Sequence, residues 1–162
     1  EKGLRVLRDE EQLAFDLLES LSDEQRRQAV VADKAPRDVR DAGKAAPPIS
    51  PAAGLPASQM KPDQVRILRS LIEAYARNLP QDVAQQRLSL VEQEGIDKVT
   101  FAWAGGDEPG VGHDYRVQGE SFLIEFNNTQ PYSAGNPSNH THCVCPHRGR
   151  TFAIPVANSQ RN

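Results

Sequence analysis

The chain has 162 residues, a formal net charge of -3 and 38% hydrophobic residues. This length suits one ordinary domain, and the modest apolar content predicts a small core. The negative balance argues against a nucleic acid as the main partner. No apolar run approaches the length of a membrane span, so we expect no membrane partner, and nothing in the sequence assigns a compartment.

The first segment, residues 1–34, is helical by pattern. In "DEEQLAFDLLESL", which begins at Asp9, leucines recur at helical spacing, and Asp9 is the candidate N-cap. Ser22 and Gln25 match an S-x-x-Q capping box. The box predicts a second helix over "SDEQRRQAVV", with a change of direction between the two helices.

Residues 35–62 interrupt the helical pattern. They hold six of the twelve prolines and show little periodicity, which is typical of an extended connection. The segment is either a flexible linker or a strap that packs over the fold. In the second case, we expect Ile49 and Leu55 to be its apolar anchors.

Residues 63–95 return to helical spacing. "PDQVRILRSLIEAYARNL" has one apolar stripe, and Pro62 fits the first position of this helix. Pro80 begins the next helix, "PQDVAQQRLSLVEQEG", and Gly95 supplies its C-terminal stop.

The pattern then changes to a period of two residues over 96–147. The expected strands are "KVTFAWAGG", "HDYRVQ", "SFLIEFNN" and "HTHCVC", with a tight turn at Gly119 and Glu120. Helices followed by strands predict an α+β fold. N-terminal helices and the proline-rich strap should pack on a C-terminal antiparallel sheet of about four strands, in a single domain.

Three histidines are candidate metal ligands. His140 and His142 lie two residues apart, so an extended strand points both to one face, and His113 begins a neighbouring strand. Three protein ligands with an open position make a catalytic metal site. The ion would be zinc first, and copper or iron next. The alternative is that these histidines only form hydrogen bonds in a polar loop.

Glu125 is the candidate catalytic residue, because a carboxylate in the apolar run "FLIEF" needs a partner. A tight two-residue hairpin puts His113 opposite Phe126, and Glu125 on the face of Arg116. This register favours a structural ion pair between Arg116 and Glu125. A bulge or a three-residue loop would instead let Glu125 join His113 as a ligand or base.

Amide side chains gather around the ends of the expected hairpin, at Gln118, Asn127, Asn128 and Gln130. They could bind a polar small-molecule substrate. They could equally satisfy strand ends and turns, which is their usual role.

Several strings in the second half carry a resemblance to a known family. "FAWAGG", "HDYRVQGESFLIEFNNTQ" and "NHTH" occur in the order found in the C-terminal half of the uncharacterised bacterial domain-of-unknown-function family numbered 3500, which this chain resembles. Members of that family are usually longer. The resemblance therefore implies that an N-terminal half is missing here, and that self-association is possible through the surface it would cover.

The chain departs from the family pattern after Val144. Family members continue with a tryptophan, an arginine and an aspartate, whereas this chain continues "CPHRGRTFAIPVANSQRN". We therefore give residues 145–162 no functional weight and expect residues 148–162 to form a divergent tail.

Two functions follow from these residues. The first is a metal-dependent enzyme with a three-histidine site, either a hydrolase that uses metal-bound water or an oxidoreductase. The second is a non-catalytic binding or structural module in which the same strands only complete a sheet.

Overall fold

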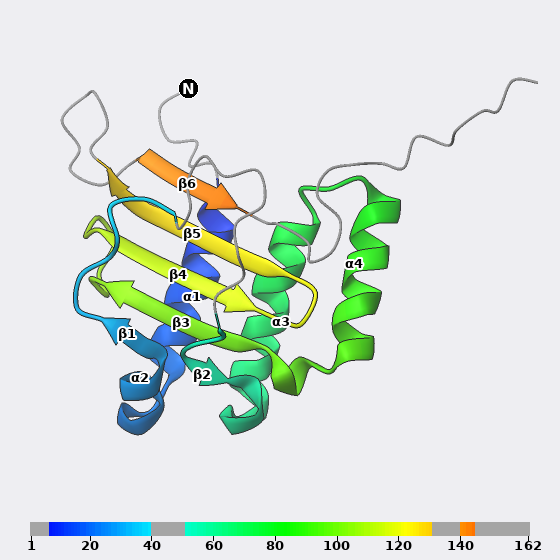
Figure 1. The fold of residues 1–162 in the computed structure, drawn as a ribbon, viewed down its shortest axis with the longest axis horizontal. Helices are drawn as coiled ribbons and strands as arrows, with labels where there is room; N and C mark the ends of the chain where they lie inside the picture. Colours follow the sequence, from blue (N-terminus) through cyan, green and yellow to red (C-terminus); the bar gives the residue numbers. More distant parts are fainter. Residues whose placement is uncertain (1–6, 40–50, 131–139, 145–162) are drawn as a thin grey trace, which may run out of the picture.

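The structure is a computed structural model of the chain. It describes residues 7–39 and 51–130, together with the backbone of 140–144. Its helices are α1 (Arg8–Ser20), α2 (Asp23–Ala29), α3 (Pro62–Ala76) and α4 (Gln81–Glu94), with short 3₁₀ turns η1 (Ala57–Gln59) and η2 (Ile96–Lys98). The helices precede the main strands, which confirms the predicted α+β class (Figure 1). Within the described residues, no helix has the length and apolar character needed to span a bilayer.

The strands form one mixed sheet. They are β1 (Val30–Ala32), β2 (Leu55–Pro56), β3 (Thr100–Gly105), β4 (His113–Gln118), β5 (Leu123–Gln130) and β6 (His140–Val144). Their order is β1-β3-β4-β5-β6, and β2 also pairs with β3. Strands β3 to β6 are antiparallel neighbours, as the alternating pattern predicts.

Two short strands lie outside the predicted set, and they make the sheet mixed instead of purely antiparallel. β1 runs parallel to β3 with Val30 opposite Trp103, and β2 runs antiparallel to it with Leu55 opposite Phe101. The sequence pattern extends the second helix through Val30 and Val31, whereas the helix ends just before them. Branching at Cβ restricts these side chains in a helix and suits them to a strand.

The N-termini of α1 and α2 are built differently. α2 has the predicted capping box, in which the Ser22 hydroxyl accepts from the Gln25 backbone and the Gln25 side chain accepts from the Ser22 backbone. α1 begins at Arg8, so Asp9 lies in its first turn and is not its N-cap. Leu7 holds the cap position in the left-handed region, with φ 63°, and makes no side-chain cap bond.

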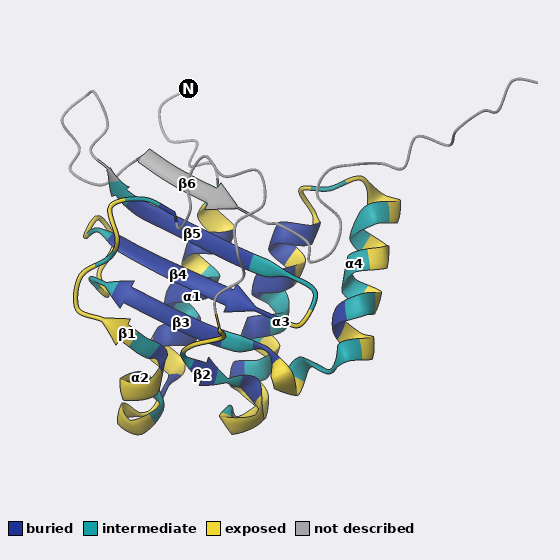
Figure 2. Cartoon of the chain, viewed as in Figure 1, coloured by how far each residue is buried: buried dark blue, intermediate teal, exposed yellow. Residues whose placement is uncertain are grey.

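The core lies between one face of the sheet and helices α1 and α3. Trp103, Tyr115 and Phe126 come from adjacent strands and stack in sequence, with centroid separations of 5.9 Å and 4.8 Å. Phe15 of α1 packs on Trp103 at 5.1 Å, and Tyr75 of α3 shares a 2.7 Å hydrogen bond with the Tyr115 hydroxyl. Figure 2 shows β3, β4 and β5 as mostly buried. The second face of these strands carries polar residues.

The proline-rich segment contacts the fold at some of its described residues, whereas others, among them Pro36 and residues 51–53, have exposed side chains. Leu55 is fully buried, and Val39 is 8% exposed. The backbone oxygens of Pro36 and Arg37 accept hydrogen bonds from side chains of β5. Ile49, the other expected anchor, lies outside the described residues.

Candidate functional site

The register of β4 and β5 sorts their side chains onto the two faces of the sheet. Tyr115 lies opposite Phe126, and Arg116 lies opposite Glu125. Directly opposed residues share a face, and the faces alternate along each strand. The face away from α1 and α3 therefore carries a set that we call the polar face, made of Asp114, Arg116, Gln118, Glu125 and Asn127.

The polar face is buried although it lies outside the apolar core. Asp114, Arg116 and Glu125 are 6%, 4% and 2% exposed. The neighbouring strand β3 contributes short side chains here, with Ala102 opposite Arg116 and Ala104 opposite Asp114. Long charged side chains thus lie beside two alanines, and the aromatic core lies on the opposite face of the same strands.

Asn127 ties the polar face to the strap. Its Nδ2 donates to Asp114 Oδ2 at 3.1 Å and to the Pro36 carbonyl oxygen at 2.9 Å. Its Oδ1 accepts from the Thr129 hydroxyl at 2.8 Å. Since Asn127 is 0% exposed, these bonds replace the water that the amide would otherwise bind. The amide therefore holds the Asp114 carboxylate at a fixed position under the strap.

His113 lies on the other face, at the end of the aromatic cluster. It is 0% exposed, and its ring stacks on Trp103 at 5.1 Å with an interplanar angle of 2°. Phe15 and Phe126 pack around it at 4.9 Å and 5.6 Å. Its Nδ1 is 2.8 Å from the Val111 carbonyl oxygen, which can only accept, so this nitrogen carries a proton.

The second ring nitrogen of His113 faces a buried glutamate. Nε2 is 3.4 Å from Glu11 Oε1, and the same oxygen accepts a 3.1 Å hydrogen bond from Asn128 Nδ2. With the Nδ1 proton committed, Nε2 presents an N–H to Glu11 only as imidazolium. Otherwise its lone pair faces a carboxyl oxygen, which is favourable only if the carboxyl holds the proton. His113 and Glu11 are therefore a buried acid–base pair in close contact.

The structure places the predicted residues His113 and Glu125 on opposite faces. His113 lies opposite Asn128 and not opposite Phe126, so the predicted hairpin register is wrong by two residues. An even shift leaves every side chain on its original face. Glu125 therefore stays on the face of Arg116, as expected, and is its direct cross-strand partner.

The register differs because the helical layer holds the hairpin loop. The backbone N–H and the hydroxyl of Ser121 both donate to Glu94 Oε2, at 3.1 Å and 2.9 Å. Phe122 packs against the core, and its carbonyl accepts from the Gly119 N–H at 3.0 Å. These contacts lengthen the loop beyond the two residues that the Gly-Glu turn signal indicates.

The predicted role of His140 and His142 as metal ligands stays a prediction, because their side chains lie outside the described part of the chain. The backbone of His142 pairs with Asn127, a member of the polar face, whereas His113 pairs with Asn128. Among the side chains that the structure describes, no group of three or more histidines, cysteines and acids is placed to hold a metal ion.

The sequence interpretation passed over Glu11, which reads as an ordinary acid in the first turn of a helix. Its spacing carried a usable signal. Glu11 precedes Ala14, Phe15 and Leu18 by three, four and seven residues, and all three are buried on the inner face of α1. An acid on an apolar helical stripe needs a partner inside the fold.

The fold and the polar face define an α+β domain with one helical layer and a buried charged surface on the opposite side of its sheet. Residues 1–152 match the family described as protein of unknown function, DUF3500, and the chain belongs to this family. The match continues past Val144, into residues that we expected to diverge. No curated protein and no solved structure matches the chain.

Proposed function

We propose that the polar face is the functional site of this domain and that it binds a small polar molecule. The observation that supports this is the burial of Asp114, Arg116 and Glu125 together on the face away from the helices. Taking ions out of water costs several kcal/mol each, and apolar residues of similar volume often give equal or greater stability. Recognition of a ligand explains these charges better than stability does.

The chemistry of the polar face suits a ligand that has both donors and acceptors. The two carboxylates only accept when ionised, the Arg116 guanidinium only donates, and the amides of Gln118 and Asn127 do both. A polyhydroxylated or zwitterionic molecule matches such a set. Ala102 and Ala104 of β3 stand beside this set and are 3% and 4% exposed, so a ligand reaches the polar face only when the chain that covers it moves aside.

Metal-dependent catalysis on this face is the more specific form of the proposal. Two histidines and one carboxylate commonly bind zinc or non-haem iron. His142 would supply one nitrogen and Glu125 the carboxylate, because His142 pairs with Asn127 two residues from Glu125. The second nitrogen is assigned to His140 from its spacing in the sequence alone, since the register shifts between Asn127 and Gln130, the partner of His140. His113 is then structural. A hydrolase would use metal-bound water with a pKa of about 7, and an oxidoreductase would use copper or iron.

A thermal-shift screen tests the binding proposal. The panel contains sugars, amino acids and hydroxy acids, since a bound ligand raises the Tm by mass action. A ligand that stabilises the wild type should not stabilise Arg116→Gln or Glu125→Gln. It should still stabilise Glu120→Gln, since Glu120 is an exposed glutamate of the hairpin loop. Equal stabilisation of all four proteins would overturn the proposal.

Metal content separates the catalytic form from a non-catalytic module. The protein is stripped with a chelator, reloaded with zinc, copper or iron, dialysed and analysed for its metals. Stoichiometric metal should disappear in the double variant His140→Ala/His142→Ala and fall in Glu125→Gln, whereas His147→Ala should keep it. Retention by the double variant would place the metal away from His140 and His142, and no metal in the wild type would leave a binding module without a metal centre.

A further inference from the structure

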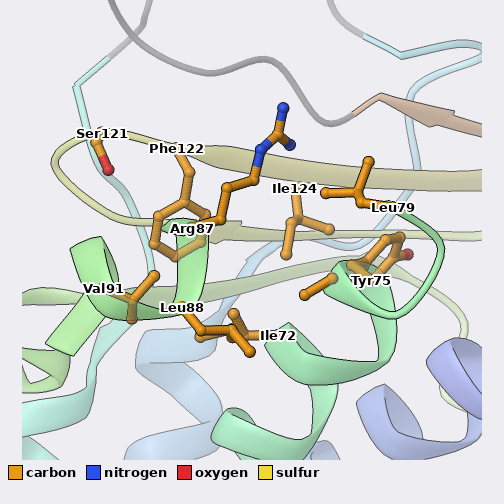
Figure 3. A pocket seen from close by; sticks show the side chains of 10 residues that line it. Ile72, Tyr75, Leu79, Arg87, Leu88, Val91, Ser121, Phe122 and Ile124 are labelled. Atoms are coloured by element: carbon orange, nitrogen blue, oxygen red, sulfur yellow. The ribbon is translucent and has the colours of Figure 1, made fainter. Parts of the chain in front are cut away.

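An apolar hollow lies on the helix side of the sheet, between α3, α4 and the β4–β5 hairpin (Figure 3). Its cavity volume is ≈ 30 Å³, which is enough for ordered water but not for an alkyl chain. Most of its wall is aliphatic or aromatic, including Ile72, Leu79, Leu88, Val91, Phe122 and Ile124. This hollow is separate from the polar face.

The polar groups around the hollow differ in whether other protein groups already bind them. The Tyr75 hydroxyl is bonded to Tyr115, and Ser121 is bonded to Glu94, so both are engaged by the protein. Arg87 is half-buried and makes no ion pair with the residues that the structure describes. In Figure 3 its guanidinium points away from the apolar side chains. A cation of this kind at the rim of an apolar hollow complements an anion.

We propose that this hollow binds a short alkyl carboxylate. The alkyl chain lies among the side chains of α3, α4 and the hairpin, and the carboxylate pairs with the Arg87 guanidinium. The fork of N–H groups in a guanidinium matches the two oxygens of a carboxylate. Burial of the alkyl chain supplies the affinity, and the guanidinium selects the charge of the head group.

Helix α4 forms a loosely packed wall of the site. Val91 is its only buried residue, and among the residues that the structure describes, two polar links tie its C-terminal part to the body. One is the ion pair between Arg69 and Glu92, whose side chains are 37% and 57% exposed, and the other joins Glu94 to Ser121. Elements with few buried contacts open at low cost. An outward movement of α4 therefore admits an alkyl chain that the closed hollow is too narrow to hold.

Titration with octanoate tests the proposal, with octylammonium as the probe of opposite charge. Calorimetry on the wild-type chain should show saturable binding of octanoate and weaker binding of octylammonium. Arg87→Met removes the charge and keeps an unbranched stem. It should weaken octanoate binding about tenfold, the order expected for one charge-assisted hydrogen bond. Arg87→Glu should reverse the preference between the two probes.

Two further variants complete the test. Arg27→Met removes an exposed arginine from α2, away from the hollow, and should leave octanoate affinity unchanged. Leu88→Trp fills the hollow and should abolish binding, and circular dichroism checks that this variant is folded. Absence of saturable octanoate binding to the wild type, or equal affinity in wild type and Arg87→Met, would overturn the proposal.

Discussion

Replacing Glu11 by methionine leaves His113 without its buried acidic partner. At a separation of 3.4 Å, two unit charges attract by about 5 kcal/mol at an effective dielectric constant of about 20. Desolvation of both groups offsets part of this attraction, and removing one member of a buried pair typically costs about 3–5 kcal/mol. Asn128 loses its acceptor in the same variant. We therefore expect Glu11→Met to lower the free energy of unfolding by about 3–5 kcal/mol.

Urea denaturation at neutral pH measures this change. Trp103 is the only tryptophan of the chain, and its ring stacks on His113, so its fluorescence reports on this part of the core. Circular dichroism follows the same transition independently. Glu19→Met is the matched control, because Glu19 lies on the same helix and is exposed. We expect it to change stability by less than about 0.5 kcal/mol.

A double-mutant cycle separates the pair from a general packing effect. His113→Phe keeps an aromatic ring stacked on Trp103 but has no ring nitrogen that can interact with Glu11. The double variant Glu11→Met/His113→Phe should therefore cost less than the sum of the two single changes, by at least about 1 kcal/mol. Additive costs, or a Glu11→Met protein as stable as Glu19→Met, would refute the buried acid–base pair.

Three further stability changes follow from the structure, each measured by urea denaturation. Gly54 and Gly110 have φ of 101° and 88°, but an added Cβ at Gly54 meets a backbone oxygen at 2.2 Å, whereas at Gly110 it meets nothing within 4 Å. Gly54→Ala should therefore lower the free energy of unfolding far more than Gly110→Ala does. Equal losses of stability in the two variants would contradict this. Ser22→Ala should lower the free energy of unfolding by about 1 kcal/mol, and an unchanged stability would show that the capping box does not stabilise the fold. Replacing Arg116 or Glu125 alone by methionine should lower the free energy of unfolding by about 3–5 kcal/mol, whereas the double variant should be nearly as stable as the wild type. A double variant less stable than either single variant would count against a charge pair.

The sequence correctly predicted the elements that are determined by residues close to one another in the chain. β4 covers "HDYRVQ" as its alternating pattern indicates, because one face of the strand meets an apolar core. Pro80 and Gly95 mark the two ends of α4, where a missing N–H and a positive φ are both tolerated. Ser22 and Gln25 form their capping box within four residues of sequence.

Features that depend on distant partners escaped the sequence interpretation. β1 and β2 are too short to show a periodic pattern, and they exist because β3 offers both of them an edge. The hairpin register depends on Glu94 holding Ser121. At the site, local alternation put Glu125 on the face of Arg116, but no local pattern could pair Glu11 with His113 across the core.

The attachment of β1 and β2 to the same strand has a consequence for the segment between them. This connection leaves β1 after Ala32 and reaches β2 at Leu55, and because both strands pair with β3, folding closes it into a loop. The entropic free-energy cost of closing a flexible loop grows only with the logarithm of the loop's length, by about 0.6 kcal/mol for each doubling of length. Insertions that leave the contacts of Pro36, Arg37 and Val39 intact should therefore be tolerated far better than the loss of the Leu55 anchor.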